Sequence, residues 1–245
     1  MRTKNILTVA ILTFLLVSYL PANAQKKVED YKLYTTVQIK PMKGKAKEFE
    51  KATLAHIEKF HKEGIRKGGL RQILTGSKSG SYVWVGGPNM FSDFDNIEND
   101  EAHNKDWDHI IENYVKHIGH LEHWKMNSEL SFTGPDAETN KFFQLWIIDV
   151  ADGEWETFNK ALGSAVEVNK EQGNTIHSYN ISFNEGNGRD VALTFGFEKW
   201  AELDEDDPFK DHYEAKHGEG SWAKFIENWQ KSTKKINQAV WKIVK

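Results

Sequence analysis

Hydrophobic and polar residues alternate in two β-rich runs, "YKLYTTVQI" and "FFQLWIIDV", each of which opens one half of the chain. This period of two, with β-branched and aromatic residues, predicts a strand in each case. A helical segment follows each strand, and we expect Gly64 and Gly173 to end these helices as C′ glycines. Two further strand-like runs, separated by glycine and polar residues, then predict one hairpin in each half.

The stretch "WDHIIENYVKHIGHLEHWK", from Trp107 to Lys125, predicts the second helix of the first half. At 100° per residue its apolar side chains share one face. A stripe beside that face contains His109, Asn113, His117, His120 and Trp124. We expect a last short strand to begin near Trp124, and its counterpart near Trp241. The resulting order, β-α-β-β-α-β, is that of the ferredoxin-like unit.

The two halves are an internal repeat. "FEKATLAHIEKFHKEG" aligns with "FNKALGSAVEVNKEQG", and "WDHIIENY" aligns with "WAKFIENW". Matches that recur in the same order along a chain indicate duplication. The polar segment 133–140 contains the turn residues Gly134 and Pro135 and is the predicted linker. We therefore expect one unit over residues 25–132 and a second over residues 141–245.

The first strand has an apolar side made of Leu33, Thr35, Val37 and Ile39. In a ferredoxin-like unit both helices cover one face of the sheet, and the other face must be buried elsewhere. We expect the apolar side to meet the sheet of the other repeat. The predicted fold class is α+β, with two tandem βαββαβ units whose antiparallel sheets pack face to face as a pseudo-dimeric barrel.

The segment "YKLYTTVQIKPMKGKAKEFEK" resembles the opening of proteins of the dimeric α+β barrel superfamily, in which a strand runs into a proline, a Gly-Lys region and a helix with Glu-Phe. The residues that fit are Ile39, Pro41, Gly44, Lys45, Glu48 and Phe49. The superfamily includes antibiotic-biosynthesis-monooxygenase-like, NIPSNAP-like and EthD-like proteins. The resemblance implies monooxygenase-like or haem-dependent activities as well as binding without catalysis, so the fold alone does not select a function.

The first 24 residues have the layout of a cleaved signal peptide, with Arg2 and Lys4 before an apolar run and a small-x-small site ending at Ala24. We expect a periplasmic or secreted protein that begins at Gln25 and has no stable membrane insertion after cleavage. The chain has no cysteine, so disulfides and thiolate ligands are excluded. Without Arg2 and Lys4 there are 30 basic and 36 acidic residues, a balance that argues against nucleic-acid binding.

Histidines are the main candidates for chemistry. His56 lies on the expected core face of the first helix, where the second repeat has Ala165, so it either makes a buried hydrogen bond or lines a cavity. His117 and His120 are one helical turn apart, but two ligands without a third do not make a metal site. In haem-binding relatives implied by the resemblance, a histidine of the second helix is an axial ligand, and His117 or His120 is similar in location.

Two further observations complete the candidate set. His103 and His217 correspond in the repeat and both precede the predicted second helix, where a capping or structural role is favoured over a functional one. Tyr82 and Trp84 share one side of their strand, but the sequence does not decide which face that side occupies. The candidate ligand-binding residues are His56, Trp84, Asn113, His117 and His120.

The leading hypothesis is a small-molecule-binding protein whose pocket lies between the helices and the sheet of the first repeat. The alternatives are a monooxygenase-like or haem-dependent oxidoreductase, and a non-catalytic structural or interaction protein. The sequence identifies neither the ligand nor the oligomeric state, and it does not decide whether the protein is an enzyme.

Overall fold

The computed structural model describes residues 30–204 and 208–245. Within this part of the chain, Tyr31–Lys245 forms one compact unit. The predicted signal peptide and its cut after Ala24 lie outside the described residues. Among the described helices, none has the length and apolar character needed to cross a membrane.

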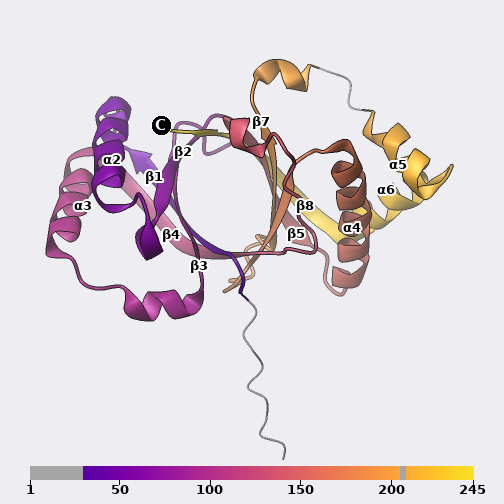
Figure 1. Ribbon diagram of the computed structural model, residues 1–245, viewed down its shortest axis with the longest axis horizontal. Helices are drawn as coiled ribbons and strands as arrows, with labels where there is room; N and C mark the ends of the chain where they lie inside the picture. The colour runs from indigo at the N-terminus through magenta and orange to yellow at the C-terminus, as the bar shows by residue number, and fades with distance from the viewer. Residues whose placement is uncertain (1–29, 205–207) are drawn as a thin grey trace, which may run out of the picture. The chain divides into compact units, whose positions relative to one another are not determined.

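Eight antiparallel strands close into a barrel, as the ring in Figure 1 shows. Each half supplies four strands in equivalent order, β4-β1-β3-β2 from the first and β8-β5-β7-β6 from the second. Two seams, β2 with β8 and β4 with β6, join the halves. The predicted pseudo-dimeric barrel and both predicted hairpins are confirmed. The strands are β1 (Leu33–Pro41), β2 (Gly68–Ile73), β3 (Tyr82–Asn89), β4 (Val115–Met126), β5 (Phe142–Val150), β6 (Ile176–Ile181), β7 (Val191–Phe197) and β8 (Thr233–Ile243).

The helices lie outside the ring, with α2 and α3 beside the first sheet and α4, α5 and α6 beside the second (Figure 1). Short 3-10 turns connect several of these elements. The helices are α2 (Ala46–Phe60), α3 (Glu101–Tyr114), α4 (Trp155–Gln172), α5 (Phe209–His217) and α6 (Ser221–Ser232). The 3-10 turns are η1 (Gly64–Arg66), η2 (Phe91–Asn96), η3 (Ala137–Thr139) and η4 (Trp200–Leu203).

The apolar side of β1 packs against its own helices rather than against the other sheet. Ile39 is buried in one cluster with Phe49 of α2 and Ile110 of α3. The expectation that this side meets the second sheet is therefore wrong. Apolar side chains of α2 and α3 cover this side of β1. The more polar side of β1, which includes Thr36 and Gln38, faces the interior of the barrel.

The predicted helix from Trp107 to Lys125 is wrong beyond Tyr114. There α3 ends, and β4 begins at once with Val115 and runs to Met126. The expected start of the last strand near Trp124 is therefore also wrong, and β8 likewise begins at Thr233, well before Trp241. Residues 115–125 pair along β1, and these ladder hydrogen bonds determine their conformation, although Ile118 and Leu121 happen to continue the helical pattern.

The first helix also ends earlier than predicted. Gly173 caps α4 in the left-handed conformation as expected, with φ of 74°. By contrast α2 ends at Phe60, with His61 as its C-cap, and Gly64 opens η1 instead. The N–H of His61 still donates to the Ile57 carbonyl at this early end, and its ring turns back toward α2.

Candidate functional site

A pocket of about 710 Å³ lies between the first sheet and the segments that cover it. Its floor comes from β1, β3 and β4, and its cover comes from the loop after α2, from η2 and from the start of α3. Such a volume is typical of a small-molecule site. The lining residues used below are Thr35, His61, Trp84, Phe94, His103, Leu121 and His123.

Trp84 of β3 occupies the centre of this floor. Its ring lies 4.5 Å from the His61 ring and 6.2 Å from the Trp107 ring, which shows that Tyr82 and Trp84 face the helices. A Cβ at Gly68 would come within 2.5 Å of the Trp84 indole. A side chain at position 68 would therefore displace the Trp84 ring from this position.

Aromatic side chains form one end of the pocket around His123. The rings of Phe91 and Phe94 lie 5.5 and 5.3 Å from the His123 ring, and Phe183 of the second repeat lies 6.1 Å away. Thr35 Oγ1 is 3.0 Å from His123 Nδ1. Burial lowers the pKa of His123, which favours its neutral form.

Arg66 ties together the segments that cover the pocket. Its guanidinium donates to Asp100 Oδ2 at 3.4 Å and to the Glu98 carbonyl. Asn89 Nδ2 donates to the Ile65 carbonyl at 3.0 Å, which anchors η1 to the end of β3. Asp100 in turn caps α3 by accepting the backbone N–H of His103 at 3.0 Å. These contacts fix the entrance relative to the floor.

Three histidines meet where α2, its C-cap and α3 come together. His61 Nε2 lies 3.1 Å from His56 Nε2 and 3.0 Å from His103 Nε2. The three ring centroids form a nearly equilateral triangle, with sides of 4.9, 4.9 and 5.0 Å. His56 is buried, His61 is at the limit of burial, and His103 is partly exposed to the pocket.

The other ring nitrogen of each histidine has its own oxygen partner. His56 Nδ1 is 2.7 Å from Asp106 Oδ2, His61 Nδ1 is 2.5 Å from the Arg66 carbonyl, and His103 Nδ1 is 3.1 Å from Asn104 Oδ1. Asn104 uses its amide nitrogen to donate to Asn99, so its oxygen is the atom that faces His103.

Burial depresses the basicity of two of these histidines. Burial, together with the neighbouring His56 and His103, lowers the pKa of His61 to about 4. It also lowers the pKa of His56, although the hydrogen bond to Asp106 acts in the opposite direction. Both imidazoles are therefore neutral near pH 7, and a neutral imidazole has one nitrogen that donates and one that accepts.

The structure brings together only some of the predicted site residues. His56 and Trp84 are joined through His61, and His103 completes the group. Asn113 is exposed and bonds to His109 of its own helix. His103 lies inside α3 rather than before it, whereas His217 ends α5 and bonds to the Ser164 carbonyl at 3.2 Å.

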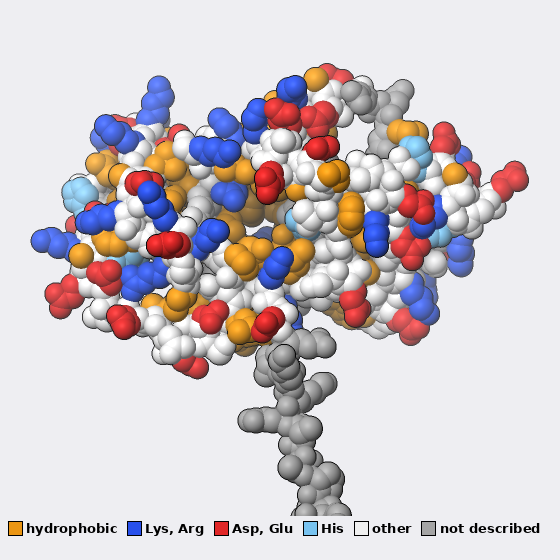
Figure 2. Space-filling model, viewed as in Figure 1, with side chains coloured by type: hydrophobic (Ala, Val, Ile, Leu, Met, Phe, Trp, Pro, Cys, Tyr) orange, Lys and Arg blue, Asp and Glu red, His pale blue; other side chains and the backbone are white. Residues whose placement is uncertain are grey.

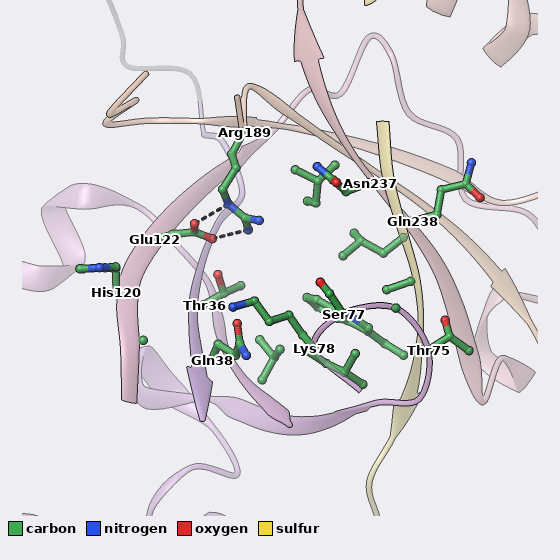
Figure 3. A pocket seen from close by; sticks show the side chains of 18 of the residues that line it. Thr36, Gln38, Thr75, Ser77, Lys78, His120, Glu122, Arg189, Asn237 and Gln238 are labelled. Carbon is green, nitrogen blue, oxygen red and sulfur yellow. Dashed lines mark hydrogen bonds and ion pairs between the residues drawn. The ribbon is translucent and has the colours of Figure 1, made fainter. Parts of the chain in front are cut away.

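His117 and His120 are not in this pocket. Both are exposed residues of β4 beside a second cavity of about 570 Å³ inside the barrel. In Figure 3, His120 points away from that cavity. The expectation that they share a pocket with His56 fails because β4, and not a helix, positions them.

A charged pair dominates the interior cavity. Glu122 of β4 accepts two hydrogen bonds from Arg189, at 2.7 and 2.8 Å, and Figure 3 shows both side chains turned into the ring. Figure 2 shows the hollow at this end of the barrel, surrounded by hydrophobic, basic and acidic side chains. The pair links β4 to the loop before β7 across the seam, so it also joins the two repeats.

Sequence reasoning missed His61 and Asp106. His61 is five residues after His56, and a continuous helix would place the two side chains on different faces. They meet because α2 ends at Phe60, an end that the sequence pattern did not indicate. Asp106 lies three residues after His103 on α3, and this helical spacing was a usable signal.

Solved structures share this fold at low sequence identity. No protein-family model matches the sequence, and neither does any curated protein sequence. A proposed monooxygenase from Fusobacterium nucleatum has 13% identity and a TM-score of 0.59, over 89% of this chain and 94% of its own. A proposed monooxygenase from Lactobacillus acidophilus has 11% identity and a TM-score of 0.55, over 88% and 95%.

A third similar structure is described as a haem-binding protein from Thermus thermophilus. It has 7% identity and a TM-score of 0.50, over 87% of this chain and 92% of its own. These similarities establish the dimeric α+β barrel fold that the opening residues resemble. At such identities they do not transfer an activity.

Proposed function

We propose that the protein binds a small, flat aromatic molecule in the 710 Å³ pocket of the first repeat. The observation that supports this most strongly is the composition of the walls. Trp84, Phe94 and Leu121 offer apolar contact area, and the polar residues among them include His61, His103 and His123. Apolar walls with a few convergent polar groups are the usual design of a ligand site.

Leu121 provides a test of this proposal that spares the core, because 58% of its side chain is exposed while it lines the pocket. Leu121→Arg places a long charged side chain across the floor. The matched control is Ile118→Arg on the same strand, which is 40% exposed and is not among the pocket residues.

The measurement is a thermal-shift screen with two- and three-ring aromatic compounds, including anthrone and 1-naphthol, followed by quenching of tryptophan fluorescence. We expect at least one compound to raise the melting temperature of the wild type and of Ile118→Arg but not of Leu121→Arg. Equal shifts in all three proteins, or no shift with any compound, contradict the proposal.

An oxidative reaction in the same pocket is the second candidate, favoured by the two monooxygenase-like neighbours of the same fold. In this version a histidine of the pocket removes a proton from the bound aromatic molecule, and O₂ oxidises the resulting carbanion to a quinone with water as the second product. His123 is partly buried, neutral and beside the aromatic wall, which suits a general base. Oxygen uptake with a compound that passes the binding screen, lost in His123→Phe, is the expected result.

Haem is the cofactor suggested by the resemblance and by the haem-binding neighbour. The pocket is large, but the ring nitrogens of His61 and His103 that are not paired with oxygen face each other at 3.0 Å. An axial ligand needs a nitrogen directed at open space, so these two residues do not fit haem iron as they stand. Titration with haemin should therefore give no Soret shift that is lost in His103→Ala.

We propose in addition that the chain is exported and cleaved after Ala24, on the basis of its first residues alone. Expression with a C-terminal tag, fractionation and N-terminal sequencing test this directly. The expected first residue is Gln25 in the exported fraction, and an intact Met1 terminus in the cytoplasm overturns it.

A further inference from the structure

The triangle of histidines has an excess of hydrogen-bond acceptors. Asp106 and the Arg66 carbonyl can only accept, so His56 and His61 must both donate through Nδ1. Their Nε2 atoms are then bare lone pairs, yet they lie 3.1 Å apart. His103 adds a third Nε2 at 3.0 Å, with its Nδ1 facing the Asn104 oxygen.

Converging lone pairs at this distance repel one another unless a cation lies between them. A single proton can bridge only two of the three nitrogens, so the lone pair of the third still faces them. A metal ion satisfies all three nitrogens at once, and neutral imidazole is a common ligand of zinc, copper, nickel and iron ions.

We propose that His56, His61 and His103 bind one divalent transition-metal ion of the zinc class through their Nε2 atoms. Such sites use nitrogen-to-metal distances of about 2.0–2.1 Å, which in tetrahedral geometry separates the nitrogens by about 3.4 Å. The separations of 3.0 and 3.1 Å need an outward shift of a few tenths of an ångström.

The contacts around the triangle are those of an organised metal site. Each ligand nitrogen is aimed by an oxygen on the far side of its ring, and the Asp106–His56 pair is a carboxylate–histidine–metal arrangement. His56 and His61 are nearly closed to solvent, whereas His103 faces the pocket. Three protein ligands leave a fourth position, which opens toward the pocket and takes water or a bound oxygen atom.

The second repeat provides an internal control because it lacks the triangle. Ala165 and Lys170 stand where the first repeat has His56 and His61. His217, the counterpart of His103, bonds instead to the Ser164 carbonyl. The site therefore belongs to the first repeat alone and is not needed for the fold.

The test uses the purified full chain, stripped with EDTA and titrated with Co²⁺ and then with Zn²⁺ against a chromogenic chelator. We expect one equivalent of Co²⁺ to give the intense visible absorption of four-coordinate cobalt, and Zn²⁺ to displace it. His103→Ala, chosen because His103 is the most exposed ligand, should weaken binding by about 100-fold or more. Asp106→Asn should weaken it by about 10- to 100-fold.

His217→Ala is the matched control and should bind as the wild type does. Circular dichroism spectra and melting curves of the metal-free variants establish that each is folded. Absence of stoichiometric binding in the wild type, or equal binding by wild type and His103→Ala, overturns the proposal. The aromatic screen is run on metal-free protein, so failure of the metal site and failure of the proposed pocket are seen separately.

Discussion

The two repeats share one backbone plan but fill the space between their helices in opposite ways. In the second repeat this space is apolar, with Tyr213 of α5 and Phe225 of α6 packed on Ala165 of α4. In the first repeat the same region holds His56, His61 and His103 between α2 and α3. The fold is thus compatible with either filling, which makes the polar one a specialisation rather than a structural requirement.

The largest expected effect tests the structural role of the second repeat. Phe225 is nearly buried and lies 4.8 and 5.0 Å from the rings of Tyr213 and Trp222. Phe225→Ala should lower the free energy of unfolding by about 3–5 kcal/mol through lost burial and a cavity. Urea unfolding measures this, and Phe183→Ala, at a ring that is 72% exposed, should change little.

Zinc should stabilise the folded protein through the histidine triangle of the first repeat. At a free concentration 100 times its Kd, zinc should add about 2.7 kcal/mol to the free energy of unfolding. The gain should disappear in His103→Ala and persist in His217→Ala, as read from melting curves with and without EDTA. A gain that survives in His103→Ala would place the bound zinc elsewhere.

Histidines introduced at the equivalent positions of the second repeat should not create a second metal site. Ala165 is buried in the apolar cluster, so Ala165→His overfills it and should cost about 1–3 kcal/mol of unfolding free energy. The double variant Ala165→His with Lys170→His should still bind only the one equivalent of cobalt held by the first repeat, because the Ser164 carbonyl already holds His217. A second equivalent of four-coordinate cobalt in that double variant would refute the contrast.

The smallest effect concerns the polar contact inside the apolar cluster. Tyr213 donates its hydroxyl hydrogen to Ser164 Oγ at 2.9 Å. Tyr213→Phe removes this single bond and leaves the ring in place, so it should cost about 0.5–1.5 kcal/mol. Chemical denaturation provides the measurement, and cobalt binding should be unchanged, since the substitution lies in the other repeat.

The fold was predictable because the same order of elements occurs in both halves of the sequence. Alternation identified β1 and β5, Gly173 marked the end of α4, and the repeated order of elements indicated paired sheets. The end of α3 was not predictable in this way, because residues 115–121 satisfy a helical pattern locally. Pairing with β1, a contact distant in sequence, decides their conformation.

The site was only partly predictable for a related reason. A histidine on a core face singled out His56, and the strand pattern singled out Trp84. His61 became a partner of His56 because the helix ends two residues earlier than Gly64 indicated. His117 and His120 were misplaced together with the helix that was expected to hold them.

The seams between β2 and β8 and between β4 and β6 have an evolutionary consequence. In a barrel built from two identical chains, every substitution appears on both sides of the axis, so a histidine that suits one helix layer is imposed on the other. A covalent tandem removes that constraint. One repeat can then acquire polar residues that are unfavourable for its own packing. The other repeat keeps its apolar packing and stabilises both, because the two share one closed barrel of strands.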